Sequence, residues 1–221
     1  MILEIEGGSV VRKIIDKYGL INVTISLICC VVFILNCLFI TKASLININE
    51  NIAIAWLLNF FAGCEGILGK WGSMSYATAF EELQLWRLVT QAYLHAGIIH
   101  MGFNLAALLV VGKYVEKRLG SVKYLTVYHL ITIIDVVVID GFLFTNSVSV
   151  GASGGIFGVI GIAFVMFMRK QLSFKKSEIV WLIIFVLIAS ALGMATLLLH
   201  AFGFVLGVIS GLILIRKNDA E

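Results

Sequence analysis

The feature that most constrains this chain is a series of six long apolar stretches that contain very few charged residues. The stretches lie at about residues 19–41, 93–112, 124–142, 151–168, 179–193 and 196–215. Most of them approach the roughly 20 residues that a transmembrane helix needs. Charged residues make up 13% of the 221-residue chain, whereas a soluble globular protein carries roughly 25%. The sequence therefore predicts an all-α polytopic membrane protein, a bundle of six transmembrane helices.

The basic residues fall mostly on one side of this predicted membrane domain, which covers residues 19–215. Thirteen of the 16 Lys and Arg residues lie in the N-terminal segment (1–18), after the second and fourth stretches, or in the tail (216–221). The other three stand in the long first outer loop (42–92): Lys42, Lys70 and Arg87. Because cytoplasmic loops carry an excess of Lys and Arg, we expect both termini in the cytoplasm.

The loop 42–92 is too apolar for a fully solvated connection. Its large aromatic residues include Trp56, Phe60, Phe61, Trp71 and Trp86. Amphipathic segments with aromatic residues lie in the membrane interface. We therefore expect residues 52–61 to form a short amphipathic helix at the outer surface.

Polar side chains inside membrane spans are costly and mark functional candidates. Ser153 precedes the basic residue Arg169 by 16 positions, and His200 precedes Arg216 by the same number. With a rise of about 1.5 Å per residue, both polar residues lie roughly 24 Å above the inner boundary. That depth is a few ångströms below the outer face of a roughly 30 Å apolar layer. The sequence therefore predicts Ser153 and His200 at the same level on two different helices.

Glycines allow these two helices to approach each other closely. Gly203, Gly207 and Gly211 follow His200 on one helical face, and several glycines surround Ser153: Gly151, Gly154, Gly155, Gly158 and Gly161. Small residues with such spacing let membrane helices pack backbone to backbone. If the two glycine faces pack together, Ser153 and His200 meet.

This pair would suit nucleophilic catalysis. A serine hydroxyl becomes a good nucleophile when a neighbouring imidazole can take its proton. The tetrahedral intermediate then needs hydrogen-bond donors aimed at its oxyanion. His100 and Asn104, somewhat deeper on the second predicted helix, could supply donors together with the backbone N–H of Ser153.

Five short motifs follow one another along residues 86–211. They are Trp86-Arg87, the HxxxxHxxxN pattern of His95, His100 and Asn104, Gly112 with Glu116, Gly151-Ala152-Ser153-Gly154, and His200 with Gly203 and Gly207. In these motifs, in their order and in the helices that carry them, the chain resembles the rhomboid family of intramembrane serine proteases. The resemblance covers more than half of the chain.

The resemblance implies a serine endopeptidase with a Ser–His dyad, in which Ser153 is the nucleophile and His200 the general base. It also implies an oxyanion hole formed by His100, Asn104 and the Ser153 amide. Supporting roles fall to nine residues: His95, Gly151, Gly154, Phe157, Gly203, Gly207, Trp86, Arg87 and Glu116. The implied partners are the bilayer and transmembrane segments of other membrane proteins, cleaved near the outer face without a cofactor or metal.

Four residues depart from the family pattern or lie outside it. Phe157, one turn below Ser153, replaces a frequent tyrosine but could still stack on His200, and Thr196 stands where a carboxylate or amide is frequent. Asp135 and Asp140 lie in the third stretch. We expect Asp135 to be buried against a polar partner and Asp140 to reach the outer headgroups.

Two other functions match parts of the pattern. A non-catalytic rhomboid-like protein would bind membrane helices, although the presence of both Ser153 and His200 argues against it. A metal carrier or metalloprotease could use His95, His100 and His200, but the five-residue spacing of the first two differs from HExxH. The four cysteines form no CxxC pair and are interpreted as small apolar residues, and no nucleic-acid-binding pattern occurs. A compact six-span chain without a targeting extension favours a prokaryotic cell membrane.

Overall fold

The computed structural model describes residues 7–39, 57, 60–61, 67–191 and 193–216. Within these ranges the regular structure is helical, apart from one isolated antiparallel bridge between Met74 and Ser149. The main helices are α1 (Gly7–Tyr18), α2 (Leu20–Leu38), α7 (Ile98–Leu119), α8 (Ser121–Val138), α9 (Ser153–Met168), α10 (Lys176–Ser190) and α11 (Met194–Leu214). Shorter elements are α5 (Ile67–Gly72), η1 (Ala77–Glu81), α6 (Arg87–Thr90), η2 (Gln91–Tyr93) and η3 (Ile139–Leu143). The prediction of an all-α protein is confirmed.

Four helical segments among the described residues are long and apolar enough to cross a membrane: α2, α7, α8 continued by η3, and α11. Helix α9 has 16 residues and α10 has 15, so length alone supports four of the six predicted spans. The largest shift concerns α7, which begins at Ile98 rather than near residue 93. Gly97 precedes it with φ +101°, a left-handed conformation that interrupts the helix.

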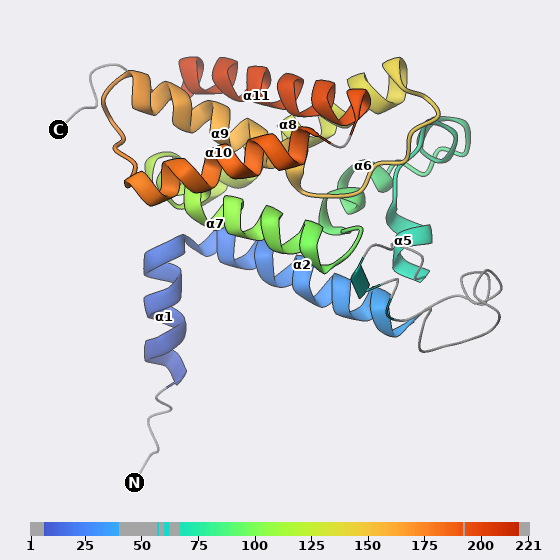
Figure 1. The fold of residues 1–221 in the computed structure, drawn as a ribbon, viewed down its shortest axis with the longest axis horizontal. Coiled ribbons are helices and arrows are strands. Elements are labelled where there is room, and N and C mark those ends of the chain that lie inside the picture. The colour runs from blue at the N-terminus through green and yellow to red at the C-terminus, as the bar shows by residue number, and fades with distance from the viewer. Residues whose placement is uncertain (1–6, 40–56, 58–59, 62–66, 192, 217–221) are drawn as a thin grey trace, which may run out of the picture.

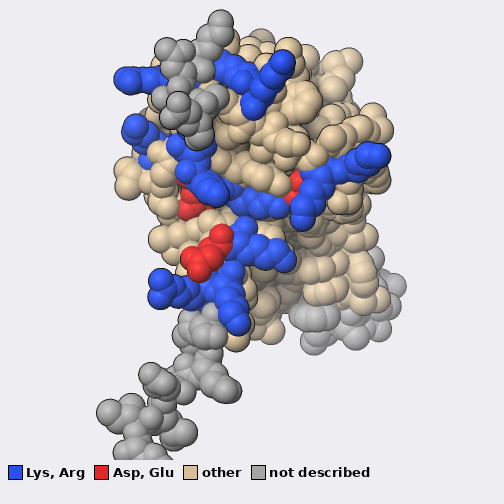
Figure 2. Space-filling model, turned by 90° about the vertical axis from the view of Figure 1, so that its left-hand side faces the viewer, with Lys and Arg blue, Asp and Glu red and all other residues tan. Residues whose placement is uncertain are grey.

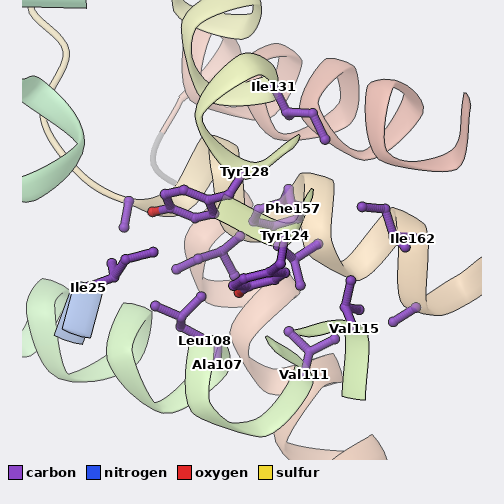
Figure 3. Close-up of a cluster of buried hydrophobic side chains, with 14 of the residues drawn as sticks. Ile25, Ala107, Leu108, Val111, Val115, Tyr124, Tyr128, Ile131, Phe157 and Ile162 are labelled. Carbon is purple, nitrogen blue, oxygen red and sulfur yellow. The ribbon is translucent and has the colours of Figure 1, made fainter. Parts of the chain in front are cut away.

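Helix α9 lies inside the bundle, packed against α7, α8 and α11 (Figure 1). Most of its residues are buried, including its glycines at positions 154, 155, 158 and 161. Its buried side chains form one cluster with those of α2, α7, α8 and α10, and Tyr124, Tyr128, Leu108 and Phe157 belong to this cluster (Figure 3). The central helix is therefore small in cross-section and apolar on nearly all sides, as a buried helix should be.

The contact between α9 and α11 is made by backbone atoms. A Cβ atom added to Gly203 would lie 2.7 Å from the carbonyl oxygen of Gly154, and one added to Gly207 would overlap Gly158. A Cβ atom added to Gly211 would lie 3.0 Å from Val165. The predicted packing of the two glycine faces is therefore present.

The amphipathic helix α1, which the sequence analysis did not predict, points away from the bundle (Figure 1). Gly19, with φ +89°, separates it from α2. The Glu116 carboxylate on α7 accepts hydrogen bonds from the amides of Ile21 and Asn22, at 2.9 and 3.1 Å. These amides belong to the first turn of α2 and have no acceptor within their own helix. Glu116 thus joins two helices at their basic end.

The predicted amphipathic helix at 52–61 falls largely outside the described residues. Of this segment the structure describes residues 57, 60 and 61, which are helical. The ring of Phe60 packs against Phe33 of α2, with centroids 5.8 Å apart. Further along the same loop, α5, η1, α6 and η2 form a compact group of short helices beside the bundle (Figure 1).

Candidate active site

Ser153 is the first residue of α9, and the short length of this helix determines its depth. Sixteen residues span about 24 Å, less than a roughly 30 Å apolar layer. The other end of α9 is followed by Arg169 and Lys170. A helix of this length with one end at a membrane surface does not reach the other surface, and residues 144–152 lead to Ser153 as irregular chain. Such backbone is tolerated at this depth where it is buried in protein or lines a cavity.

His200 lies on α11 with its imidazole 2% exposed. Its ring stacks on Phe157 of α9, with centroids 4.1 Å apart and planes inclined by 6°. The stacking that the sequence predicts is therefore present, and it fixes the plane of the imidazole. Neither ring nitrogen has a hydrogen-bond partner among the described residues. In this structure the imidazole is consequently not hydrogen-bonded to Ser153.

Ser153 and His200 line one cavity of about 480 Å³, which is also lined by His100 and Asn104. Apolar side chains of α10 form part of its wall: Phe185, Ile188 and Ala189. Thr196 on α11 and Asp140 at the end of the α8 segment line it as well. The cavity thus combines a small polar group with a large apolar surface, as ligand sites usually do.

Hydrogen-bond donors face this cavity from two sides. The Nδ2 atom of Asn104 donates to the His100 carbonyl at 3.1 Å, and Asn104 itself is 1% exposed. The first-turn amides of α9, beginning with that of Ser153, have no acceptor within their helix. The same helix end carries the positive end of the helix dipole. A negative charge on an oxygen next to Ser153 would therefore be favoured.

Gly151 allows the chain to pass between these groups. Its φ of +124° is unfavourable for any other residue type. A Cβ atom at this position would also lie 2.9 Å from Cε1 of the His100 ring. The first glycine of the motif is therefore required by backbone conformation and by space.

The segment 144–151 leading to Ser153 is held by contacts that the sequence analysis missed. Ser149 exchanges two backbone hydrogen bonds with Met74, of 3.1 and 2.7 Å, and the Gly151 amide donates to the Gln91 carbonyl at 2.9 Å. The Asp140 carboxylate accepts hydrogen bonds from the Ser149 hydroxyl and, at 2.9 Å, from the Ser147 hydroxyl. We call this segment the strap.

These contacts correct the expectation for Asp140. The residue is 3% exposed and bonded to the strap, so it does not reach the headgroups. It lies in the π-helical turn η3, in which Ile139 and Gly141 are buried as well. No periodic pattern could have revealed this, because the partners belong to an irregular segment.

Asp135 is 1% exposed and lies against the two helices that carry the cavity residues. Its Oδ2 atom would be 3.2 Å from a Cβ atom added to Gly203, and it also lies next to Gly154. Neither carboxylate oxygen has a hydrogen-bond partner among the described residues. The expected polar partner is therefore not found, and the two glycines provide the room for the carboxyl group.

The remaining predicted residues support the surroundings. His95 is 1% exposed and contacts His100 edge to face, with centroids 5.2 Å apart. The Arg87 guanidinium donates to the carbonyls of Lys70 and Ser73, at 2.9 and 2.6 Å, and so closes the first loop. Trp86 stacks on Trp71, with centroids 5.7 Å apart.

The structure thus brings Ser153, His200, His100 and Asn104 to one cavity and leaves Glu116 at the opposite end of α7. In the described ranges, no group of three or more His, Cys, Asp or Glu side chains is arranged to hold a metal ion.

Comparison with known proteins identifies one family. The family model described as "Rhomboid domain" matches residues 82–217, more than half of the chain. The chain is 27% identical over 159 residues to RHOMBOID-like protein 7 of Arabidopsis thaliana, covering 70% of this chain and 50% of that protein. It is 34% identical over 126 residues to Rhomboid protease GluP of Bacillus subtilis (strain 168), covering 57% and 24%.

A third relative is Inactive RHOMBOID-like protein 8 of Arabidopsis thaliana, 29% identical over 109 residues, covering 49% of this chain and 30% of that protein. The chain therefore spans half or less of the length of these relatives. Their names include both proteases and a protein named as inactive, so activity depends on which side chains line the cavity.

Proposed function

The chain belongs to the rhomboid family, and on this premise we propose that it is an intramembrane serine endopeptidase with Ser153 as nucleophile and His200 as general base. One observation carries the proposal: both residues line a single cavity, on two helices that their glycines hold backbone to backbone. This arrangement holds the two helices close together beside the cavity that both residues line. Catalytic hydrogen bonds are often long without substrate and tighten when it binds.

The reaction begins when His200 accepts the proton of the Ser153 hydroxyl. The Ser153 Oγ atom attacks the carbonyl carbon of the cleaved peptide bond and forms a tetrahedral intermediate. His200 then gives the proton to the leaving nitrogen, and an acyl-enzyme remains on Ser153. Water attacks this ester with His200 again as the base. His200 then returns the proton to the Ser153 oxygen as the ester bond breaks, and the second product leaves with the new carboxyl group. Phe157 holds the imidazole in one plane throughout.

The oxyanion of each tetrahedral intermediate needs fixed donors. The Ser153 amide and the dipole of α9 act from one side. The His100 ring and the Asn104 amide line the same cavity and act from the other. Because Gly151 has no side chain, the His100 ring can lie close to the chain that leads to Ser153. Removal of one such donor typically costs about 10²–10³-fold in kcat.

The substrates in this proposal are transmembrane segments of other proteins, cleaved near the outer face of the membrane. The helices that carry Ser153, His200 and Asn104 all run from the cavity to basic residues at their other ends. The positive-inside rule assigns such an end to the cytoplasm. The apolar wall of α10 gives a transmembrane segment a surface of matching chemistry.

The test is cleavage of a single-pass model substrate in liposomes by wild type, Ser153→Ala and His200→Ala. We expect cleavage by wild type and a loss of about 10³-fold or more in both variants, because the nucleophile or its base is removed. Ser210→Ala, on the same helix as His200 but outside the cavity, is the matched control and should cleave normally. Cleavage by Ser153→Ala at the wild-type rate would refute the proposal.

The second candidate is a non-catalytic protein that binds membrane helices. Two observations are consistent with it. The His200 imidazole has no hydrogen-bond partner among the described residues, and one relative is named as inactive. This candidate would be favoured if folded wild-type protein binds the model substrate and a panel of other single-pass substrates but cleaves none of them.

A further inference from the structure

The end of the bundle opposite the cavity is strongly basic (Figure 2). Twelve described Lys and Arg residues lie there: Arg12, Lys13, Lys17, Lys113, Lys117, Arg118, Lys123, Arg169, Lys170, Lys175, Lys176 and Arg216. Two of the acidic residues at this end are buried and occupied within the protein. Glu116 accepts from amides of α2, and Glu178 pairs with Lys113 at 2.6 Å. Among the described residues of this face, basic side chains therefore far outnumber acidic ones.

Within this face lies a pocket of about 380 Å³ lined by Arg118, Leu119, Lys123, Leu214 and Arg216. Its lining comes from three helix ends: the last turn of α7, the first turn of α8 and the residues at the end of α11. Among the described residues, those that line it include no acidic side chain. Three cationic groups that converge from separate elements on one hollow suit a phosphate group, which accepts several charge-assisted hydrogen bonds at once.

The backbone at this pocket is fixed. The Gln171 side-chain amide donates to the carbonyl of Arg216 at 2.9 Å, which ties the end of α11 to the segment after α9. Gly120, with φ +78°, makes the turn between α7 and α8 and so sets Arg118 and Lys123 on either side of it. A pocket held in this way is prepared for a ligand before the ligand arrives.

The surroundings of the pocket indicate which phosphate compound it binds. Val122 is 79% exposed and Ile213 is 73% exposed, and both stand next to residues of the pocket. The pocket therefore lies where exposed apolar side chains of α8 and α11 adjoin the basic surface. An anionic phospholipid has this same division, with a charged headgroup above apolar chains.

We propose that the pocket of Arg118, Lys123 and Arg216 is a binding site for the headgroup of an anionic phospholipid. The phosphate is held by the three cationic groups, and the acyl chains lie along the exposed apolar side chains of α8 and α11. The site is about one helix length from Ser153 and does not depend on whether the protein cleaves peptide bonds. It would fix the depth and tilt of α7, α8 and α11 in a membrane that contains such lipids.

The experiment is native mass spectrometry of the full chain in detergent micelles, titrated with phosphatidylglycerol or with phosphatidylcholine of the same acyl chains. We expect wild type to retain phosphatidylglycerol preferentially. The double variant Lys123→Gln/Arg216→Gln should bind it roughly tenfold more weakly, because two exposed cationic groups at the pocket are lost. Lys123→Arg should bind normally, because it keeps the charge.

The matched control is Arg12→Gln/Lys13→Gln, which removes one Arg and one Lys from the same basic end but from α1, outside the pocket. This control should retain phosphatidylglycerol like wild type. An equal loss in both double variants would show attraction by the whole face rather than a site, and would overturn the proposal. Displacement of the lipid by millimolar inorganic phosphate would also overturn it, because it would assign the pocket to a soluble anion.

Discussion

The two sides of the cavity are built differently. On one side, α9 and α11 meet through glycines, so that no side chain separates Gly207 from Gly158. On the other side, α10 is held by side chains, and an apolar pocket of about 350 Å³ that is open to the outside lies between it and α9. A polar tie between α10 and α7 is the ion pair of Lys113 and Glu178, at 2.6 Å, to which the Tyr114 hydroxyl adds hydrogen bonds.

This difference separates two requirements of the proposed activity. The nucleophile and its base need a fixed distance, and backbone contact between α9 and α11 supplies it. A transmembrane substrate needs a neighbouring helix that can move aside to admit it. Helix α10, which is packed through side chains next to an apolar pocket, is suited to this role. Local stability in proteins follows packing in this way, since the least packed elements open first.

The largest expected effect is on the glycine contact. Gly207→Leu places a side chain where the Gly158 backbone lies, so α9 and α11 must separate. Overpacking of this kind costs about 1–3 kcal/mol or more, and we expect a large drop in thermal stability together with loss of cleavage. Gly102→Ala on α7, where an added Cβ atom meets nothing within 4 Å, is the control and should behave like wild type. Normal stability of Gly207→Leu would contradict the assigned packing.

The next effect concerns the strap that positions Ser153. Asp140→Ala removes the acceptor of the Ser147 and Ser149 hydroxyls, so the strap can shift. Displacement of a reacting group by about 1 Å can cost about 10²-fold, and we expect kcat to fall about tenfold or more while the fold is kept. Asp135→Asn is the control, because the Asp135 carboxylate has no hydrogen-bond partner among the described residues. Equal losses in the two variants would mean that the strap contact has no special role.

The sequence predicted the level of Ser153 and His200 because a helix rises by a fixed amount per residue. Both residues stand 16 positions before a basic residue at the same end of the bundle. The stacking of Phe157 on His200 was predictable for the same reason, since residues four apart share a helical face. These predictions needed only periodic structure.

Other features were not predictable, because irregular segments have no periodicity. The bridge between Met74 and Ser149 joins residues 75 positions apart, and nothing in either segment points to the other. Asp140 is buried in a π-helical turn with its partners in an irregular segment, and Gly19 separates α1 from α2. The strap and the basic pocket therefore emerged from the structure alone.

A smaller effect is expected at α10. Lys113→Met removes the cation of the Lys113–Glu178 pair, which costs about 1 kcal/mol because both side chains are partly shielded from water. Hydrogen exchange should become faster at the first turns of α10 and stay unchanged in α9 and α11. Lys117→Met, an exposed position on the same helix, is the control. Faster exchange throughout the bundle would show that α10 is not a separate unit.

The smallest effect is expected where the structure leaves room. Ala163→Leu adds three carbon atoms at the edge of the apolar cavity between α9 and α10. Gly207→Ala adds only one carbon atom, but at the backbone contact. We expect the free energy of unfolding to change by less than about 1 kcal/mol for Ala163→Leu and by more for Gly207→Ala. A side chain added beside an open pocket strains the structure less than one forced against backbone atoms. The reverse order would refute the distinction between the two sides.

The most direct measurement of the central claim is covalent labelling of the cavity serine. A serine-directed fluorophosphonate is added to the protein in micelles, and the modified peptide is identified by mass spectrometry. The account predicts a single adduct on Ser153 that forms far more slowly in His200→Ala, because the imidazole no longer takes the hydroxyl proton. An adduct on another serine, or labelling of Ser153 at the same rate without His200, would contradict it.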